Sequence, residues 1–258
     1  MGNDQRAAMT LRLLVPFHNV EPWISDCLES IRQQSMADWH CSLVDDLSDD
    51  GSLHIAQSFV ETDRRFTLVR NSERRYQCDN YQRILRNPEF RDEDICISID
   101  ADDYLPDPGV FQRVVTAYEN PTTWMTYGSF RRTQGKPGGC VCAPLTDTAH
   151  VRQLPWVTSH LRTWRLFLWK QIRPDDLLGP DGALLRSAGD LAFMFPMIEM
   201  AGNDHLKFLE SVNYIYNDAN PKCNHFVRAE EQKRNAQFLR SKPPYAPLAD
   251  ASKHLNGL

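Results

Sequence analysis

Acidic residues form two clusters in this sequence, and each cluster directly follows a short apolar run. Residues 100–103 (Asp-Ala-Asp-Asp) follow the apolar run 95–99, and the Asp45-Asp46 pair follows the run 41–44. Carboxylates held this close repel one another and raise each other's pKa, and a divalent cation relieves that repulsion. Mg²⁺ and Mn²⁺ bind one or two carboxylates together with phosphate oxygens of a substrate. The 100–103 cluster is therefore a candidate site for a metal and a phosphate, although an acidic turn before a helix gives the same pattern.

Strands and helices that alternate along the first half of the chain would position these acids. Apolar runs indicate strands and helical spacing of apolar residues indicates helices. The strands are expected at 11–17, 41–44, 66–69 and 95–99, and the helices near 23–31, 53–60, 81–85 and 111–118. Four such repeats predict an α/β fold with a mostly parallel sheet flanked by helices. Ligands of these sheets bind beyond the carboxyl ends of the strands, so both acidic clusters are expected to face one crevice.

The second half of the chain lacks the regular alternation of strand and helix patterns seen in the first half. A further strand is expected at 123–130, and the Gly- and Pro-rich stretch 135–144 reads as a loop. An apolar helix is expected over 192–200, ending at Gly202, and a short strand at 212–216.

Composition excludes several classes of function. The net charge of −5 and the pI of about 5.9 argue against a nucleic-acid-binding surface. The polar N-terminal residues predict no secretory signal, and no apolar window approaches a membrane span. The seven cysteines are odd in number and follow no disulfide pattern, which is typical of reduced thiols in the cytoplasm. A cytoplasmic protein without a transmembrane segment is expected, and peripheral association with a membrane stays open.

Three segments resemble, in order and spacing, the signature of glycosyltransferase family 2 on the GT-A fold. They are Val15-Pro16-Phe17-His18-Asn19, Val44-Asp45-Asp46-Leu47-Ser48-Asp49-Asp50-Gly51-Ser52 and Ile99-Asp100-Ala101-Asp102-Asp103-Tyr104-Leu105. The resemblance implies one Rossmann-like GT-A domain over 1–258, with a nucleotide-sugar-binding half at 11–130 and a helical half at 131–258 that binds the acceptor and carries catalysis. It further implies metal-dependent transfer of a sugar from a nucleotide-diphosphate sugar, expected to be a UDP-sugar, to a hydroxyl of a glycan. The transfer is expected to invert the anomeric centre and to use Mn²⁺ or Mg²⁺.

The resemblance also assigns roles on the donor side. Residues that would bind the nucleotide or the rest of the donor are Pro16, His18, Asp45, Asp46, Arg75, Asn80, Asp100 and Ala101. Among them Asp46 would meet the base, and Asp100 would touch ribose or diphosphate. Asp102, the second acid of an Asp-x-Asp motif, would bind the metal. For Arg75 and Asn80 a solvated helix start is the competing interpretation.

The general base expected from the resemblance is Asp190, just before the apolar helix. Family members often carry a Glu-Asp pair there, and this chain has Gly189 in place of the Glu. A helix cap is the alternative role of Asp190. A late histidine often completes the metal site, and His225 fits that place better than His205, which follows a helix end.

Acceptor binding is expected at His160, Arg162 and Trp164. Aromatic rings pack against sugar C–H surfaces, and arginine binds anionic groups in a bidentate manner. A helix that buries Trp164 in the core is the alternative.

Two other classes of protein stay open at this stage. A phosphohydrolase or a nucleotidyltransferase could also place acids at strand ends, although aspartyl-phosphate hydrolases use an earlier Asp-x-Asp. A non-catalytic module that binds nucleotide sugars is the second alternative, because Gly189 departs from the family pattern.

Overall fold

The computed structural model describes residues 9–134, 142–221, 228–249 and 254–255. The elements of the first half are β1 (Leu11–Phe17), α1 (Glu21–Arg32), β2 (Trp39–Asp45), α2 (Ser52–Thr62), β3 (Phe66–Arg70), α3 (Tyr76–Ile84), β4 (Ile95–Ser98) and α4 (Val110–Tyr118). Those that follow are β5 (Met125–Arg132), η1 (Thr148–His150), β6 (Arg162–Arg165), α5 (Leu166–Lys170), η2 (Pro174–Leu177), α6 (Gly189–His205), β7 (Leu206–Tyr216) and α8 (Ala229–Ser241). The alternation of strands and helices predicted for the first half is confirmed.

The strands of the described residues form one seven-stranded sheet in the order β3-β2-β1-β4-β6-β5-β7. All neighbours run parallel except β6, which is antiparallel to both β4 and β5. The chain builds outward from β1 to β3 and then crosses to β4 on the other side of β1. This reversal is a topological switch point, where open α/β sheets bind their ligands at the carboxyl ends of the strands.

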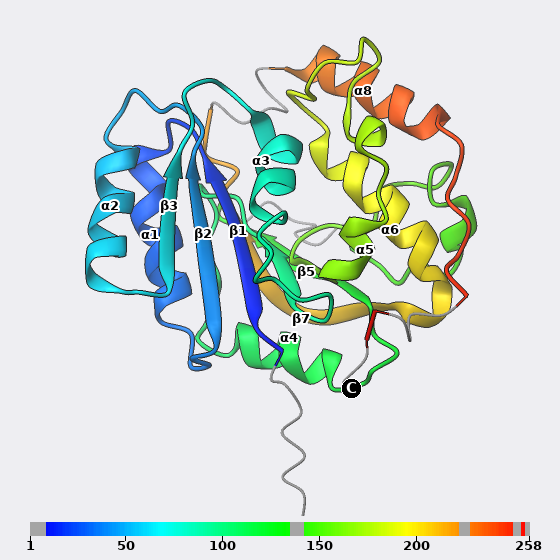
Figure 1. The fold of residues 1–258 in the computed structure, drawn as a ribbon, viewed down its shortest axis with the longest axis horizontal. Coiled ribbons are helices and arrows are strands. Elements are labelled where there is room, and N and C mark those ends of the chain that lie inside the picture. The colour runs from blue at the N-terminus through cyan, green and yellow to red at the C-terminus, as the bar shows by residue number, and fades with distance from the viewer. Residues whose placement is uncertain (1–8, 135–141, 222–227, 250–253, 256–258) are drawn as a thin grey trace, which may run out of the picture.

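Alternate residues of the central strands enter two separate cores. In β1, Leu13 and Val15 pack in the core with α1, α2 and α4, whereas Leu14 packs in the core with α3, α5 and α6. Figure 1 shows the same two layers, with α1 and α2 on one side of the sheet and α3, α5 and α6 on the other. Because side chains of a strand alternate between faces, a strand covered on both faces is apolar throughout. This explains the nearly continuous apolar run of β1.

The second half continues the same sheet. Residues 162–165 form strand β6 and not the helix that was the alternative for this stretch. The apolar helix α6 is longer than predicted, but its regular backbone breaks at Gly202 (φ 63°, ψ −176°), where the helix was expected to end. The predicted division into two functional halves stays a prediction, although a single hydrogen-bonded sheet runs through both.

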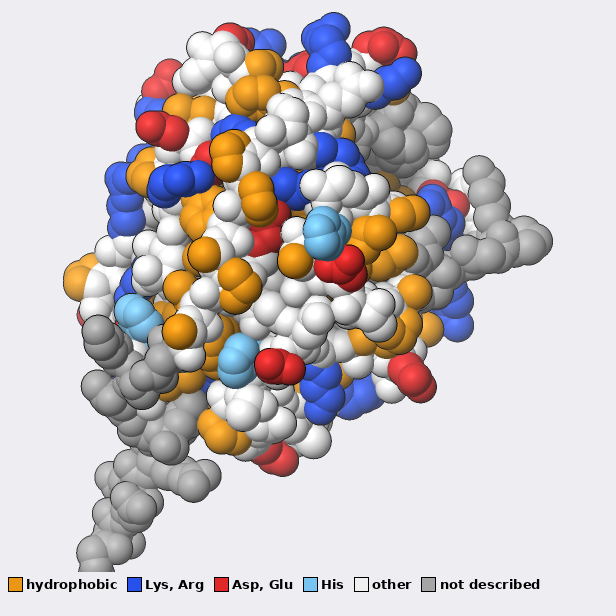
Figure 2. All heavy atoms as spheres, turned by 90° about the vertical axis from the view of Figure 1, so that its right-hand side faces the viewer, with side chains coloured by type: hydrophobic (Ala, Val, Ile, Leu, Met, Phe, Trp, Pro, Cys, Tyr) orange, Lys and Arg blue, Asp and Glu red, His pale blue; other side chains and the backbone are white. Residues whose placement is uncertain are grey.

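The visible surface carries a mixture of side-chain types, as the composition of the chain leads one to expect. On the face in Figure 2, basic, acidic and hydrophobic side chains are interspersed. None of the described helices combines the length and the apolar character that crossing a membrane requires.

Candidate functional site

A pocket of about 380 Å³ opens at the carboxyl ends of β1, β2 and β4. Its other walls come from the starts of α3, α6 and α8 and from β6. The pocket therefore lies at the switch point of the sheet, and the two acidic clusters contribute to one crevice as predicted.

Most of the predicted site residues meet in this pocket. Those that line it are Pro16, His18, Asp46, Asn80, Asp100, Ala101, Asp102, His160, Arg162 and Asp190. These residues come from segments far apart in the sequence, and the fold brings the predicted donor, metal, acceptor and base residues together in one pocket. Their individual roles stay predictions.

Three predicted residues are in the described structure but do not present their side chains to the pocket. Trp164 is fully buried beside Tyr81 and Phe193, so it has no surface to offer an acceptor, and its predicted role is wrong. The Arg75 guanidinium pairs instead with Glu73 and with Asp79.

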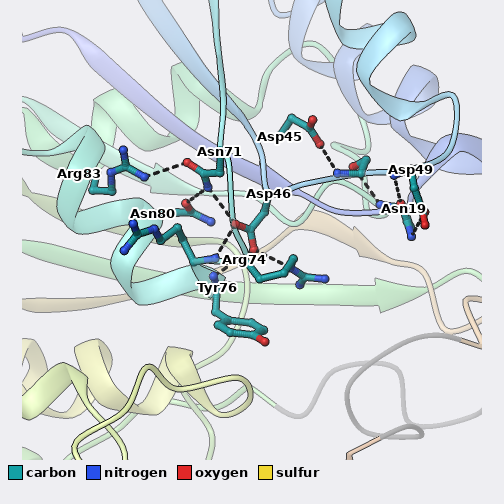
Figure 3. Close-up of polar contacts among 11 residues, drawn as sticks. Asn19, Asp45, Asp46, Asp49, Asn71, Arg74, Tyr76, Asn80 and Arg83 are labelled. Atoms are coloured by element: carbon teal, nitrogen blue, oxygen red, sulfur yellow. Dashed lines mark hydrogen bonds and ion pairs between the residues drawn. The ribbon is translucent and has the colours of Figure 1, made fainter.

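Asp45 is the third of these residues. Its carboxylate is fully buried, accepts a 2.8 Å hydrogen bond from the N–H of Ser48 and pairs with Nε of Arg70 at 3.1 Å. Figure 3 shows it pointing away from its neighbour Asp46. Asp45 therefore shapes the turn after β2 and does not line the pocket. His225, the predicted metal ligand, lies outside the described residues.

The Asp46 carboxylate accepts four hydrogen bonds. Its Oδ1 accepts hydrogen bonds from Nδ2 of Asn71 and from the N–H of Arg75, both at 2.8 Å. Its Oδ2 receives Nε of Arg74 and the N–H of Tyr76, both at 3.0 Å (Figure 3). Burial alone would raise the pKa of this carboxyl, but the hydrogen bonds from Arg75, Asn71 and Tyr76 outweigh it and lower the pKa. A carboxylate offers about four lone pairs, so a direct hydrogen bond from the base to Asp46 conflicts with this geometry.

The acids that follow β4 divide between the pocket and the interior. Asp100 and Asp102 line the pocket, and Asp102 also accepts a 2.7 Å hydrogen bond from Nδ2 of Asn220. Asp103 is buried and accepts the N–H of Asn217 at 2.7 Å. Burial raises the pKa of Asp103 well above its ordinary value, with Asp102 and Asp100 adding to the effect.

Asp100 is a pocket carboxylate whose ionised form is disfavoured by its surroundings. Burial raises its pKa to about 6, Arg162 opposes the shift, and Asp102 and Asp190 increase it. Because 35% of the Asp100 side chain remains exposed, solvent screens part of this repulsion. A cation bound between Asp100 and Asp102 would relieve it, so these residues fit a divalent metal.

A second group of possible ligand atoms lies deeper. Among the described residues, Asp100, Asp103 and His160 each have one ligand atom within 4.8 Å of the others. His160 stacks on Tyr214 with ring centroids 4.4 Å apart, and burial lowers the pKa of its imidazole well below the ordinary value. However, Nη2 of Arg162 lies 3.3 Å from Nε2 of His160. Arginine can only donate, so it occupies the Nε2 lone pair, and the pocket-facing pair Asp100 and Asp102 is the better site.

Asp190 lies in the first turn of α6 and faces β6. Its Oδ2 accepts Nη2 of Arg162 at 3.0 Å, and no side chain caps the helix. The alternative role of Asp190 as a helix cap is therefore not what the structure shows. Although burial disfavours the charge on Arg162, Asp190 and then Asp100 raise the pKa of its guanidinium. Arg162 thus links the two carboxylates electrostatically.

Close contacts with α3 explain why a glycine, Gly189, precedes Asp190. A Cβ at Gly189 would lie 3.0 Å from Oε1 of Gln77 and 3.2 Å from Sγ of Cys78. That thiol also lies 3.3 Å from the carbonyl oxygen of Gly189. The start of α6 is packed closely against α3, and a glutamate at this position would not fit without displacing Gln77.

Sequence reasoning missed several pocket residues, namely Tyr76, Gln77, Arg186, Tyr216, Arg228 and Gln232. One signal could have found two of them. Arg228 and Gln232 are four residues apart at the start of an amphipathic helix and so share one face. Nothing in the local sequence singles out Tyr76.

The sequence of this chain is similar to those of proteins named as glycosyltransferases. Residues 13–163, more than half of the 258-residue chain, match the family described as Glycosyl transferase family 2. The "Uncharacterized glycosyltransferase EpsJ" of Bacillus subtilis (strain 168) is 24% identical over 220 residues, which cover 80% of this chain and 60% of EpsJ. The "Putative glycosyltransferase EpsH" of the same organism is 40% identical over 57 residues, covering 22% of this chain and 17% of EpsH. The matched part of the chain thus spans less than two thirds of the length of these relatives.

Solved structures share the fold. S. aureus TarS 1-349 in complex with UDP-GlcNAc has a TM-score of 0.64 and 17% identity, over 82% of this chain and 59% of TarS 1-349. Mannosyltransferase PcManGT from Pyrobaculum calidifontis, in complex with GDP-Man and Mn²⁺, has a TM-score of 0.61 and 19% identity, over 98% of this chain and 70% of its own. The match of residues 13–163 to the family model, over more than half of the chain, shows that this chain belongs to glycosyl transferase family 2.

Proposed function

We propose that this chain transfers a sugar from a nucleotide-diphosphate sugar to a hydroxyl group of a glycan, in a reaction that depends on Mn²⁺ or Mg²⁺. One observation carries the proposal: Asp190 on α6 and the pair Asp100 and Asp102 after β4 line the same pocket. This arrangement supports a base for the acceptor on one wall of the cavity and a site for the leaving diphosphate on another.

The donor side supplies charge stabilisation. Asp102, with Asp100, would hold the metal, and a bound cation supplies positive charge against the developing charge of the departing diphosphate. Pro16 and His18 would line the nucleotide. TarS is solved with UDP-GlcNAc and PcManGT with GDP-Man. We propose a UDP-sugar as the donor, and a GDP-sugar is the alternative to test.

The acceptor side supplies the base. Asp190 would accept the proton of the acceptor hydroxyl as its oxygen attacks the anomeric carbon and the bond to the diphosphate breaks. The proton ends on Asp190, and the electron pair of the broken bond leaves with the nucleoside diphosphate. A single displacement of this kind inverts the anomeric centre. Arg162, which donates to Asp190, would keep that carboxylate oriented.

The deciding experiment measures products and metal dependence together. The protein is incubated with UDP- and GDP-sugars and a panel of glycans, with Mn²⁺ or with chelator, and free nucleoside diphosphate and glycosylated product are quantified. We expect both products with Mn²⁺ only, and loss of both in Asp102→Asn. Release of nucleoside monophosphate and sugar 1-phosphate would instead favour a phosphohydrolase. Release of pyrophosphate when a nucleoside triphosphate and a sugar 1-phosphate are supplied would favour a nucleotidyltransferase.

The non-catalytic alternative gives a different result. A binding module would show metal-dependent affinity for nucleotide sugars by calorimetry without turnover of any donor, including slow hydrolysis. Asp49→Asn is a matched control for Asp102→Asn, because Asp49 is an exposed acid of the β2–α2 turn that does not line the pocket.

A further inference from the structure

Tyr76 has a backbone conformation that its side chain disfavours. Its φ is +58°, in the left-handed region, where a bulky residue is an outlier. Such residues persist only where their surroundings enforce the conformation, and they cluster at ligand sites. The described chain has three other non-glycine residues with positive φ, namely Asn19, Leu47 and Ala188. Tyr76 and Ala188 line the pocket, and Asn19 and Leu47 are adjacent in sequence to residues that line it.

Asp46 enforces the conformation of Tyr76. Its Oδ1 binds the N–H of Arg75 and its Oδ2 binds the N–H of Tyr76, at 2.8 and 3.0 Å. Both amides belong to the start of α3 and have no carbonyl partner within that helix. One carboxylate therefore fixes two successive peptide groups and with them the direction in which the Tyr76 side chain leaves the backbone (Figure 3).

That direction points the ring into the pocket, with cations beside it. Tyr76 lines the pocket, and the guanidinium of Arg74 lies 5.0 Å from the ring centroid. The guanidinium of Arg186, on the loop before α6, lies 6.0 Å from the same ring. Arg74 is itself held by Oδ2 of Asp46 at 3.0 Å. The ring is thus an aromatic face at a fixed place in a polar cavity.

The position of the ring suits the base of the donor. Tyr76 is tied to the end of β2, whereas the proposed metal residues follow β4, with β1 between them. Neighbouring strands lie about 4.8 Å apart, which puts the two strand ends roughly 10 Å from each other. In a nucleoside diphosphate the ribose holds the base away from the diphosphate by a comparable span.

We propose that Tyr76 stacks on the nucleobase of the donor, and that Asp46 is a positioning residue which sets this ring and does not hydrogen-bond to the base. The inference rests on the proposed function, since it presumes a nucleotide donor. Stacking on an aromatic ring depends little on which base is bound, because every base has a π-face. The ring therefore contributes affinity for the base without selecting it.

The test removes the ring and keeps the backbone. Glycine adopts positive φ without penalty, so Tyr76→Gly deletes the ring while preserving the turn, and Tyr76→Asn is a second ring-free variant that tolerates this region. Tyr76→Phe keeps the ring and is the matched control. UDP, GDP and inorganic pyrophosphate, each with Mn²⁺, are titrated into all four proteins by calorimetry. Thermal unfolding confirms that each variant is folded.

We expect both ring-free variants to bind UDP and GDP on the order of 10-fold more weakly, with pyrophosphate affinity unchanged. Tyr76→Phe should match the wild type. Unchanged UDP affinity in the ring-free variants would overturn the inference, and so would an equal loss for UDP and pyrophosphate, which would assign Tyr76 to the diphosphate. Wild-type protein that binds no nucleoside diphosphate would instead contradict the proposed function.

A double-mutant cycle tests the role of Asp46. If Asp46 acts through the ring, Asp46→Asn weakens UDP binding in the wild type and adds little in Tyr76→Gly. If the two losses add in full, Asp46 contacts the base independently and the positioning role is wrong. Pyrophosphate binding serves as the internal reference in both backgrounds.

Discussion

The pKa values of the carboxylates on two walls of the pocket are shifted in opposite directions. On the wall after β2, Asp46 accepts four hydrogen bonds from its own protein, and its pKa is lowered. On the wall after β4, Asp100 lies close to other acids, and its pKa is raised to about 6, chiefly by burial. Both follow parallel strands of the same sheet, with β1 between them, so strand-end position alone does not decide what an acid does. The difference lies in the nearby hydrogen-bond donors: four of them satisfy Asp46, whereas Asp100 lies among other acids, an arrangement that a bound cation would stabilise.

The largest effect expected is on turnover, at Asp190. Asp190→Asn keeps the size of the side chain but cannot take up the proton, so the rate should fall on the order of 10²–10⁴-fold. Nucleotide affinity, measured by calorimetry, should stay within about twofold. Asp181→Asn is the matched control, because Asp181 is an exposed acid of the loop before α6 that lies outside the pocket. A rate within a few-fold of wild type would leave Asp190 as an ion-pair partner of Arg162 only.

An intermediate effect is expected on stability, at Asp46. Asp46→Asn replaces a four-fold acceptor by a group that itself donates, leaving buried donors unmatched, at about 1–3 kcal/mol for each. Because its pKa is lowered on folding, ionised Asp46 contributes stability above pH 3.8 that is lost as the pH falls through the folded-state pKa. Urea unfolding should therefore show a large gap between wild type and variant at pH 7 that narrows below pH 4. A gap that is absent at pH 7 would remove the contrast between the two walls.

The smallest effect is expected at Asp100, and it has the opposite sign. Its pKa is raised on folding, so protonated Asp100 contributes stability that is present below pH 3.8 and is lost as the pH rises through about 6. Without metal, Asp100→Asn should be slightly more stable than wild type at pH 8, by less than about 1 kcal/mol because solvent screens the carboxylate. The two proteins should converge below pH 4. Added Mn²⁺ should stabilise the wild type more than the variant, and the reverse order would contradict the proposed site.

The sequence predicted the central strands because their chemistry is regular. The apolar runs of β1, β2 and β4 are buried on both faces, and α1 and α2 carry apolar faces at helical spacing, so periodicity located them. It also located the acidic clusters at strand ends. Asp45 was misassigned because the two adjacent aspartates point in different directions, and a shift of one residue reverses the face of a strand.

The β6 strand was not predictable from periodicity. Its four residues, Arg-Thr-Trp-Arg, are all buried. Arg162 pairs with Asp190, while Arg165 donates to the carbonyl oxygens of Thr123 and Tyr118. Buried arginines depend on partners from distant parts of the chain, and a hydrophobic pattern cannot anticipate them. The Tyr76 conformation was hidden for the same reason, because the residue that enforces it is thirty positions earlier.

The antiparallel strand β6 has one more consequence, for how such a chain can diversify. It hydrogen-bonds directly to β4, so the ladder ties Arg162 to the strand that precedes Asp100 and Asp102, and an ion pair joins Asp190 to Arg162. The spacing between the proposed base and the proposed metal residues is therefore set largely by the sheet. The remaining pocket residues, such as Arg186 and Gln232, come from a loop and a peripheral helix that are not part of this ladder. Under the proposed function, substitutions there would change the shape and charge of the pocket without moving the proposed base or metal residues, so substrate choice could evolve separately from the reaction.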